Sequence, residues 1–199
     1  MPPSLYLASA SPRRHELLNQ IGVNHEILRV PTPPGEDEPQ HPGEPAHLYV
    51  QRTAMEKAMR ACDFIKEQKL APKPVLSADT CVILDGQVLG KPIDDADTRR
   101  ILGLLSGSTH EVHTAIVVAW QGQYFNDVSI TQVRMKPLEE EEIIAYCASG
   151  EANGKAGAYG IQGLASVFIE HISGSYSGVM GLPLFETCRL LRRAYSASA

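Results

Sequence analysis

Charged residues occupy positions in this chain that local folding preferences alone would not give them. Arg13 and Arg14 follow a Ser-Pro pair at the start of an amphipathic segment, where cations oppose the positive end of a helix dipole. Asp79 interrupts an apolar run, and Lys91 follows a tight turn that would bring the chain back beside it. A carboxylate inside a strand costs desolvation. Together these residues suggest a polyphosphate ligand and a carboxylate that activates water.

The segment from Ser9 to Arg14 has the features of an anion site. A short strand is expected to deliver the chain to a helix whose free N–H groups and dipole attract phosphate. Arginine adds paired hydrogen bonds to phosphate oxygens. The alternative is a solvated first turn whose basic residues bind nothing.

Asp79 and Lys91 could instead form a purely structural ion pair. Because desolvation offsets much of the attraction in a buried pair, such a pair is better explained by chemistry. Lys57 lies about 60° from the centre of the apolar stripe of its helix and leans inward, although a lysine there could also snorkel to solvent. Arg52 is expected to point to solvent.

The proline-rich loop 31–45 carries a run of three acidic residues, Glu36, Asp37 and Glu38, and a further one at Glu44. Such residues most often belong to a solvated loop. One that reached the pocket could share a divalent cation with Asp79, because hard cations prefer carboxylate oxygens.

A second loop, 150–163, is rich in glycine and carries Tyr159 and Gln162. Its spacing differs from the dinucleotide fingerprint G-x-G-x-x-G. It could hold a nucleobase, with Gln162 reading the hydrogen-bonding edge. His110 and His113 form H-x-x-H, but on a strand they face opposite sides, which argues against a metal site.

The elements that must position these residues follow from hydrophobic periodicity and turn signals. Strands are expected over 5–9, 75–84, 87–91, 113–120, 124–134 and 166–172, and helices over 12–21, 46–69, 95–105, 139–148 and 184–195. Hairpins mixed with crossovers predict an α/β fold with a mixed sheet flanked by helices. The length of 199 residues predicts a single domain, 1–199.

Composition narrows the choice of partners. A net charge of −5 argues against a nucleic-acid surface. The four cysteines lie far apart without C-x-x-C, so neither a metal cluster nor a disulfide framework is expected. No apolar run approaches the roughly 18 residues of a membrane span, and no signal-peptide pattern opens the chain. The expected setting is the cytoplasm, without a membrane partner.

Six segments in order resemble the Maf family of nucleoside triphosphate pyrophosphatases, from about Leu5 to Leu191. They are S-A-S-P-R-R (9–14), the E-K-A around Lys57, S-A-D-T (77–80), L-G-K-P (89–92), K-A-G-A-Y-G-I-Q-G (155–163) and G-L-P-L (181–184). The resemblance implies an elongated, two-lobed α/β fold with a central cleft, related to that of the inosine triphosphatases. A-Y-G-I-Q-G and G-S-Y-S-G-V resemble the branch that acts on dTTP and UTP.

The resemblance also implies roles for individual residues. Asp79 matches the family's proton acceptor. The phosphate-handling positions correspond to Ser9, Arg13, Arg14, Lys57 and Lys91. Glu38 matches an acidic active-site residue, which would share Mg²⁺, Mn²⁺ or Co²⁺ with Asp79. Arg13, Thr80 and Gln162 match positions tied to substrate choice, and Tyr159 joins Thr80 and Gln162 in favouring a pyrimidine. Family members are often dimers, so a homodimer is an expectation.

Two departures from the family pattern stand out. Gly154 replaces an aspartate and could loosen the loop on the base side, which weakens the pyrimidine prediction. Thr53 replaces a leucine and is expected to change only packing. Rival interpretations are a pyrophosphatase for inosine or xanthosine triphosphate or for 7-methyl-GTP, and a nucleotide-binding regulator of cell division without turnover.

Overall fold

The computed structural model describes residues 4–31 and 39–197. The elements in chain order are β1 (Leu5–Leu7), α1 (Pro12–Gln20), β2 (His25–Ile27), α2 (Ala46–Glu67), β3 (Val75–Leu84), β4 (Gln87–Leu89), α3 (Asp95–Leu105), β5 (Thr109–Trp120), β6 (Gln123–Met135), α4 (Glu140–Ala148), the 3₁₀ helices η1 (Ala156–Ala158) and η2 (Leu164–Phe168), β7 (Ile169–Ser173), α5 (Tyr176–Val179) and α6 (Leu184–Ser196). None of the helices in these described ranges is both long and apolar enough to cross a membrane.

One mixed sheet of seven strands organises the molecule, in the order β2-β1-β3-β5-β6-β7, with β4 also paired to β3. β1 runs parallel to β2 and β3, and the other pairs are antiparallel. The parallel pairs follow from helical crossovers and the antiparallel pairs from hairpins. The predicted α/β class with a mixed, helix-flanked sheet is confirmed.

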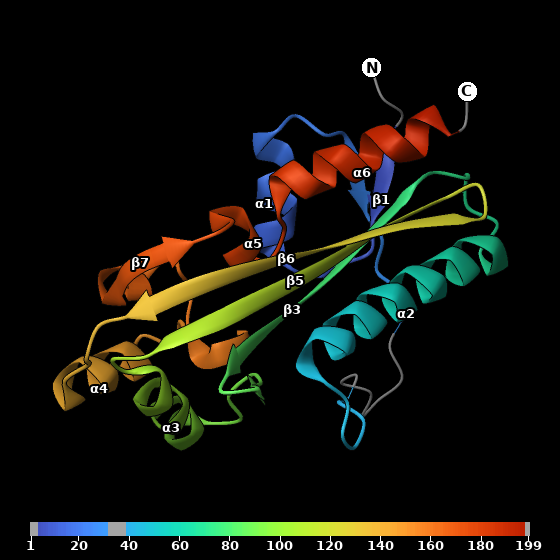
Figure 1. The fold of residues 1–199 in the computed structure, drawn as a ribbon. Coiled ribbons are helices and arrows are strands. Elements are labelled where there is room, and N and C mark those ends of the chain that lie inside the picture. Colours follow the sequence, from blue (N-terminus) through green and yellow to red (C-terminus); the bar gives the residue numbers. More distant parts are fainter. Residues whose placement is uncertain (1–3, 32–38, 198–199) are drawn as a thin grey trace.

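The two faces of the sheet are covered differently. α2 packs on the face that carries Ala115 and Val117, and its own small side chains let it lie close. α1 and α6 pack on the opposite face, over Ile116 and Val118 (Figure 1). The alternation of neighbouring residues between two cores is the two-residue period of a strand buried on both sides.

A second group of elements lies at the other end of the long strands (Figure 1). It covers the same sheet face as α1 and α6, because Val82 and Val112 lie an even number of residues from Ala78 and Ile116. There α3, α4 and the segment around η1 and η2 pack over Val82, Val112 and Val133. The two groups bury separate apolar clusters, which gives the two lobes expected from the family resemblance. Thr80 and Thr114 lie on the same face of the sheet between the clusters, paired across β3 and β5.

A break in strand pairing along β3 leaves an opening at the sheet edge. β1 pairs with β3 only at Val75 and Leu76, and β4 pairs only from Val82 onward. Between them, residues 77–81 pair with β5 alone. Because successive side chains point to opposite faces, Asp79 and Thr80 can both border this opening, one from each face.

Several expectations about elements need correction. Residues 166–168 belong to the 3₁₀ helix η2, and β7 starts at Ile169. β5 begins at Thr109 rather than 113, β4 stops at Leu89, and β2 was not expected. The Asp85-Gly86 turn is confirmed, with φ of 49° and 79° at its two residues, as a two-residue hairpin requires.

Candidate functional site

A pocket of about 1210 Å³ opens at the unpaired edge of β3 and extends between the two lobes. Its walls come from the β1–α1 loop, α1, α2, β3, the start of the loop 150–163 and the segment 179–181. The lining residues include Ser9, Arg13, Arg14, Lys57, Asp79, Thr80, Lys91 and Tyr159, all expected at the site from sequence. Gln162 is exposed and is not among the lining residues.

The described lining residues carry a large excess of positive charge. Seven of them are arginine or lysine, namely Arg13, Arg14, Arg29, Lys57, Arg60, Lys91 and Lys155, whereas Asp79 is their only carboxylate. The whole chain has a net charge of −5. A pocket of opposite sign to its protein attracts an anionic ligand, because low-dielectric walls focus the field of the lining charges.

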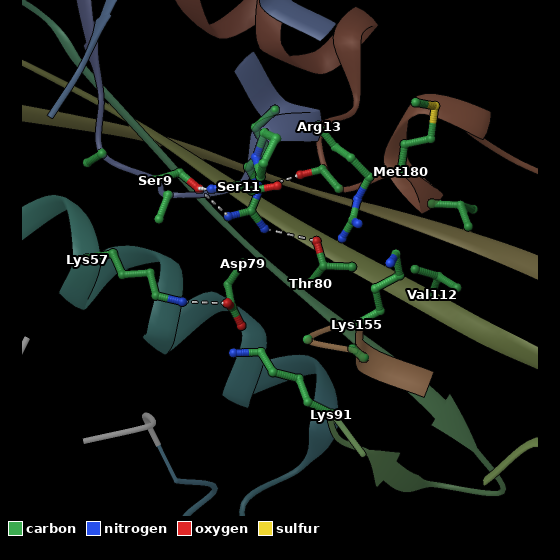
Figure 2. A pocket seen from close by; sticks show the side chains of 18 of the residues that line it. Ser9, Ser11, Arg13, Lys57, Asp79, Thr80, Lys91, Val112, Lys155 and Met180 are labelled. Atoms are coloured by element: carbon green, nitrogen blue, oxygen red, sulfur yellow. Dashed lines mark hydrogen bonds and ion pairs between the residues drawn. The ribbon is translucent and has the colours of Figure 1, made fainter. Parts of the chain in front are cut away.

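Asp79 receives a donor on each carboxylate oxygen. Lys57 Nζ lies 2.6 Å from Oδ1, and Thr53 Oγ1 lies 2.7 Å from Oδ2. The Asp79 side chain is 16% exposed, so it keeps access to the pocket. Figure 2 shows Lys91 pointing toward the same carboxylate from a second direction, below it in the view. The carboxylate is therefore held in place and surrounded by cations.

Arg14 connects three parts of the chain through its guanidinium group. Nε donates to the Gly181 carbonyl at 2.8 Å, and Nη1 donates to Ser9 Oγ at 3.1 Å and to the Ala78 carbonyl at 2.8 Å. The Ala78 carbonyl belongs to the unpaired stretch of β3, so Arg14 supplies a donor where the neighbouring strand is missing. Much of the hydrogen-bonding capacity of Arg14 is thus used within the protein, and phosphate binding by it stays a prediction.

The hydroxyl of Thr80 has a defined orientation. Thr114 Oγ1 donates its proton to the Gly178 carbonyl at 2.8 Å, so it can only accept from Thr80 Oγ1, 3.0 Å away. Thr80 Oγ1 in turn accepts from Arg14 Nη2 at 3.2 Å. Because the single Thr80 proton is committed to Thr114, this hydroxyl can offer a substrate only an acceptor.

Lys155 was not expected at the site, yet it lines the pocket beside Arg13 (Figure 2). Its ammonium group donates to the Glu151 carbonyl. Burial, followed by repulsion from Arg13, lowers the pKa of Lys155. Within the described residues Arg13 has no hydrogen bond or ion pair. Two cations side by side favour an anion between them.

The glycine-rich loop is tied to itself by the carboxylate of Glu151. This carboxylate accepts from Tyr146 Oη at 2.9 Å and from the Leu164 amide at 2.9 Å. A Cβ on Gly163 would lie 2.5 Å from Glu151 Cδ, and one on Gly157 would lie 2.7 to 2.9 Å from three atoms of Val82. These glycines therefore allow close packing inside the protein. From the sequence, the loop was expected only to hold a nucleobase.

Tyr159 borders the pocket but directs its hydroxyl into the protein. Tyr159 Oη lies 2.8 Å from Nε2 of His110, which is 1% exposed. Burial lowers the pKa of His110 to about 4, so this imidazole is neutral near pH 7. The amide that lines the pocket on this side belongs to Asn153. His110 and His113 point to different partners, Tyr159 and Glu111, as their spacing predicted.

Arg52 does not point freely into solvent. It lies 2.7 Å from Glu44 and 3.1 Å from Glu56, and it donates to the Pro39 carbonyl at 2.9 Å. The hydrogen bond from Arg52 lowers the pKa of Glu44 to about 2. Arg52 therefore fastens residues 39–44 to the start of α2.

The metal prediction rests partly on Glu38, which lies outside the described residues, as do Glu36 and Asp37. Among the described residues no group of three or more His, Cys, Asp or Glu side chains could hold a metal ion. Asp79 alone still fits Mg²⁺, because this ion is commonly bound by one or two carboxylates together with substrate phosphates.

Five site residues escaped the sequence analysis: Thr53, Arg29, Arg60, Asn153 and Lys155. Thr53 was assigned a packing role, which is corrected by its hydrogen bond to Asp79. The sequence did contain a signal for this role, because Thr53 precedes Lys57 by one helical turn and the two side chains share one face of α2. Arg29 and Arg60 gave no comparable signal, because an arginine after a short strand or on a helix is usually solvated.

Comparison with known proteins identifies the family. The Maf-like protein family model matches residues 4–194. This chain belongs to the Maf family. A relative from Bordetella pertussis named dTTP/UTP pyrophosphatase is 63% identical over 193 residues, which cover 97% of this chain and 93% of the relative. A protein of the same name from Aromatoleum aromaticum is 50% identical over 194 residues, covering 94% of this chain and 93% of that protein.

A solved structure described as that of the Staphylococcus aureus Ham1 protein is also similar. It is 11% identical, covers 67% of this chain and 72% of its own, and has a TM-score of 0.46. This likeness is too distant to support conclusions about the Maf chain.

Proposed function

We propose that this chain is a nucleoside triphosphate pyrophosphatase that hydrolyses dTTP and UTP to the monophosphate and pyrophosphate. The observation that carries the proposal is the charge of the pocket. Among its described lining residues, seven side chains are cationic and Asp79 is the only carboxylate. The full-length relatives named dTTP/UTP pyrophosphatase support the choice of substrate.

In this proposal the triphosphate lies among the cations with its α-phosphorus near Asp79. Asp79 accepts a proton from water as the water oxygen bonds to that phosphorus and the bond to the α–β bridging oxygen breaks. The leaving pyrophosphate carries the negative charge, which neighbouring cations such as Arg13, Lys91 and Lys155 neutralise. Because phosphoryl transfer depends mostly on positioning and electrostatics, these side chains would supply much of the rate.

A divalent cation is part of the proposal. Held by Asp79, Glu38 and phosphate oxygens, Mg²⁺, Mn²⁺ or Co²⁺ would supply further neutralisation of the phosphate charge. Dialysis against a chelator should remove activity, and adding back each ion in turn identifies the preferred one. Full activity after exhaustive chelation would contradict a metal requirement.

The base is proposed to lie against the loop that carries Asn153, Gly154 and Lys155. The Asn153 amide offers both a donor and an acceptor, which match the N3–H and the carbonyl oxygens of uracil and thymine. A cytoplasmic location and a homodimer stay predictions; light scattering coupled to gel filtration tests the second.

The deciding experiment is a panel of triphosphates with detection of pyrophosphate. It contains dTTP, UTP, CTP, GTP, ITP, XTP and 7-methyl-GTP, each assayed with Mg²⁺, Mn²⁺ and Co²⁺. We expect the highest kcat/KM for dTTP and UTP. Preference for ITP, XTP or 7-methyl-GTP would instead favour a rival pyrophosphatase. Tight binding without turnover under every cation would favour a regulatory nucleotide-binding protein.

A further inference from the structure

Thr53 on α2 faces the carboxylate of Asp79 from the buried side of the pocket. Thr53 is fully buried, and its Oγ1 lies 2.7 Å from Asp79 Oδ2. We propose that Thr53 is a positioning residue, whose hydroxyl holds Asp79 in the orientation that accepts a proton from the attacking water. The inference rests on the proposed pyrophosphatase function.

The hydroxyl of Thr53 has a choice of two acceptors. Its oxygen lies 3.1 Å from the Val50 carbonyl and 2.7 Å from Asp79 Oδ2. It has only one proton, and neither of these oxygens can donate to it when Asp79 is ionised. The shorter distance and the charge of the carboxylate favour donation to Asp79. A threonine inside a helix usually bonds back to its own helix; here the better acceptor lies on β3.

Thr53 and Lys57 together fix both oxygens of the carboxylate. They stand one helical turn apart on α2, so their side chains share one face. Lys57 holds Oδ1 at 2.6 Å, while Thr53 holds Oδ2. With a single donor the carboxylate could still turn about its last side-chain bond, but one donor on each oxygen restricts that rotation. The remaining lone pairs stay available for a water in the pocket.

The donor is itself held firmly in place. Val50, Ala54 and Ala58, on the same buried side of α2, are fully shielded from solvent. Ser77 on β3 donates to the Ala54 carbonyl at 2.8 Å, which fastens the helix to the strand beside Asp79. Lys57, by contrast, is 27% exposed and has a long flexible side chain. Thr53 is thus the more rigid of the two contacts.

The test compares two pairs of variants that differ in the hydroxyl: the wild type with Thr53→Val, and Thr53→Ser with Thr53→Ala. Removing a hydrogen bond to a charged group should lower kcat for dTTP roughly 10-fold or more in Thr53→Val and Thr53→Ala. KM should change less than about twofold, because Thr53 is buried behind Asp79 and does not contact substrate. Thr53→Ser should keep kcat near that of the wild type.

Thr187→Val is a matched control, because Thr187 is also a fully buried helical threonine, bonded to the Pro183 carbonyl at 2.7 Å. Its kcat should equal that of the wild type. Melting temperatures show which variants fold, and the Ser–Ala pair decides the question if Thr53→Val does not. The inference is wrong if kcat depends on side-chain volume rather than on the hydroxyl, so that Thr53→Ser loses as much kcat as Thr53→Ala. If the wild type itself releases no pyrophosphate, the proposed function fails instead.

Discussion

The two walls of the pocket are built on different principles. Around Asp79, side chains from separate elements converge, with Arg13 and Arg14 on α1, Lys57 on α2 and Lys91 after β4. The opposite wall is formed by residues 153–156 and Tyr159. They belong to one continuous segment, from Glu151 to Ala165, that is tied to itself by the Glu151 carboxylate. The first wall is assembled from separate elements. The second is one segment, which is held by its own Glu151 carboxylate and by contacts to Val82 on β3 and His110 on β5.

This difference decides how each wall responds to substitution. Charges on the converging wall are positioned by separate elements. Apart from Arg14, which ties Ser9, Ala78 and Gly181 together, removing one should change chemistry and leave the fold intact. On the self-tied wall, a Cβ added to Gly157 or Gly163 would overlap Val82 or Glu151, so changing these two glycines should disturb stability first. The following experiments test that contrast.

The largest effect is expected from Asp79→Asn. Loss of a general base should lower kcat by about 10² to 10⁴, measured as pyrophosphate release from dTTP, with a melting temperature close to that of the wild type. Asp85→Asn is the matched control, because it removes the same charge in the hairpin turn outside this pocket. Near-normal turnover of Asp79→Asn would contradict the assignment of the base.

The next effect is a dependence of stability on pH. It comes from His110, which is buried behind Tyr159 of the self-tied wall. The pKa of His110 is lowered by burial to about 4, so between about pH 6.5 and 4 the unfolded chain binds a proton that the folded chain does not. The free energy of unfolding should therefore fall as pH drops through this window, by about 3 kcal/mol from this group. Denaturant unfolding at pH 7, 5.5 and 4.5 measures it, and His110→Gln should flatten the dependence. An unchanged slope would contradict the burial argument.

A smaller loss of stability is expected from Gly163→Ala. The added Cβ would lie 2.5 Å from Glu151 Cδ, which should lower the free energy of unfolding by roughly 1 to 3 kcal/mol. Gly103→Ala is the control, because a Cβ there meets no atom within 4 Å and lies inside α3. Equal unfolding midpoints for Gly163→Ala and the wild type would show that the loop is looser than its contacts indicate.

The smallest effect is expected from Gln162→Ala. Its side chain is exposed and does not line the pocket, so the ratio of kcat/KM for UTP to that for CTP should not change. Asn153→Ala should reduce this ratio several-fold, since loss of one hydrogen bond is worth about 1 kcal/mol. The reverse result would restore Gln162 as the residue that reads the base.

Much of the converging wall could be predicted from sequence. Strand 75–84, helix 95–105 and the Asp85-Gly86 turn have the predicted bounds, because periodicity and turn chemistry are local signals. Arg13 and Asp79 could be recognised because each opposes what its own element prefers, whereas Lys57, which alone could snorkel to solvent, was assigned through the family resemblance. The self-tied wall could not be predicted. Gly157 and Gly163 are needed because Val82 and Glu151 leave no room for a side chain there, and the sequence does not show that these residues are neighbours.

The sequence by itself determined the α/β class, most element bounds, and Asp79 with four of the seven cations that meet in the pocket. The bounds depend on local periodicity, and several of the charges are recognisable because their positions are costly. Only the tertiary structure decided that Thr53 holds Asp79, that the Thr80 proton is committed to Thr114, and that Asn153 rather than Gln162 lines the pocket. These depend on donor and acceptor distances between elements far apart in the chain. A hydrogen bond needs its partners within about 3 Å, and sequence spacing does not encode that precision.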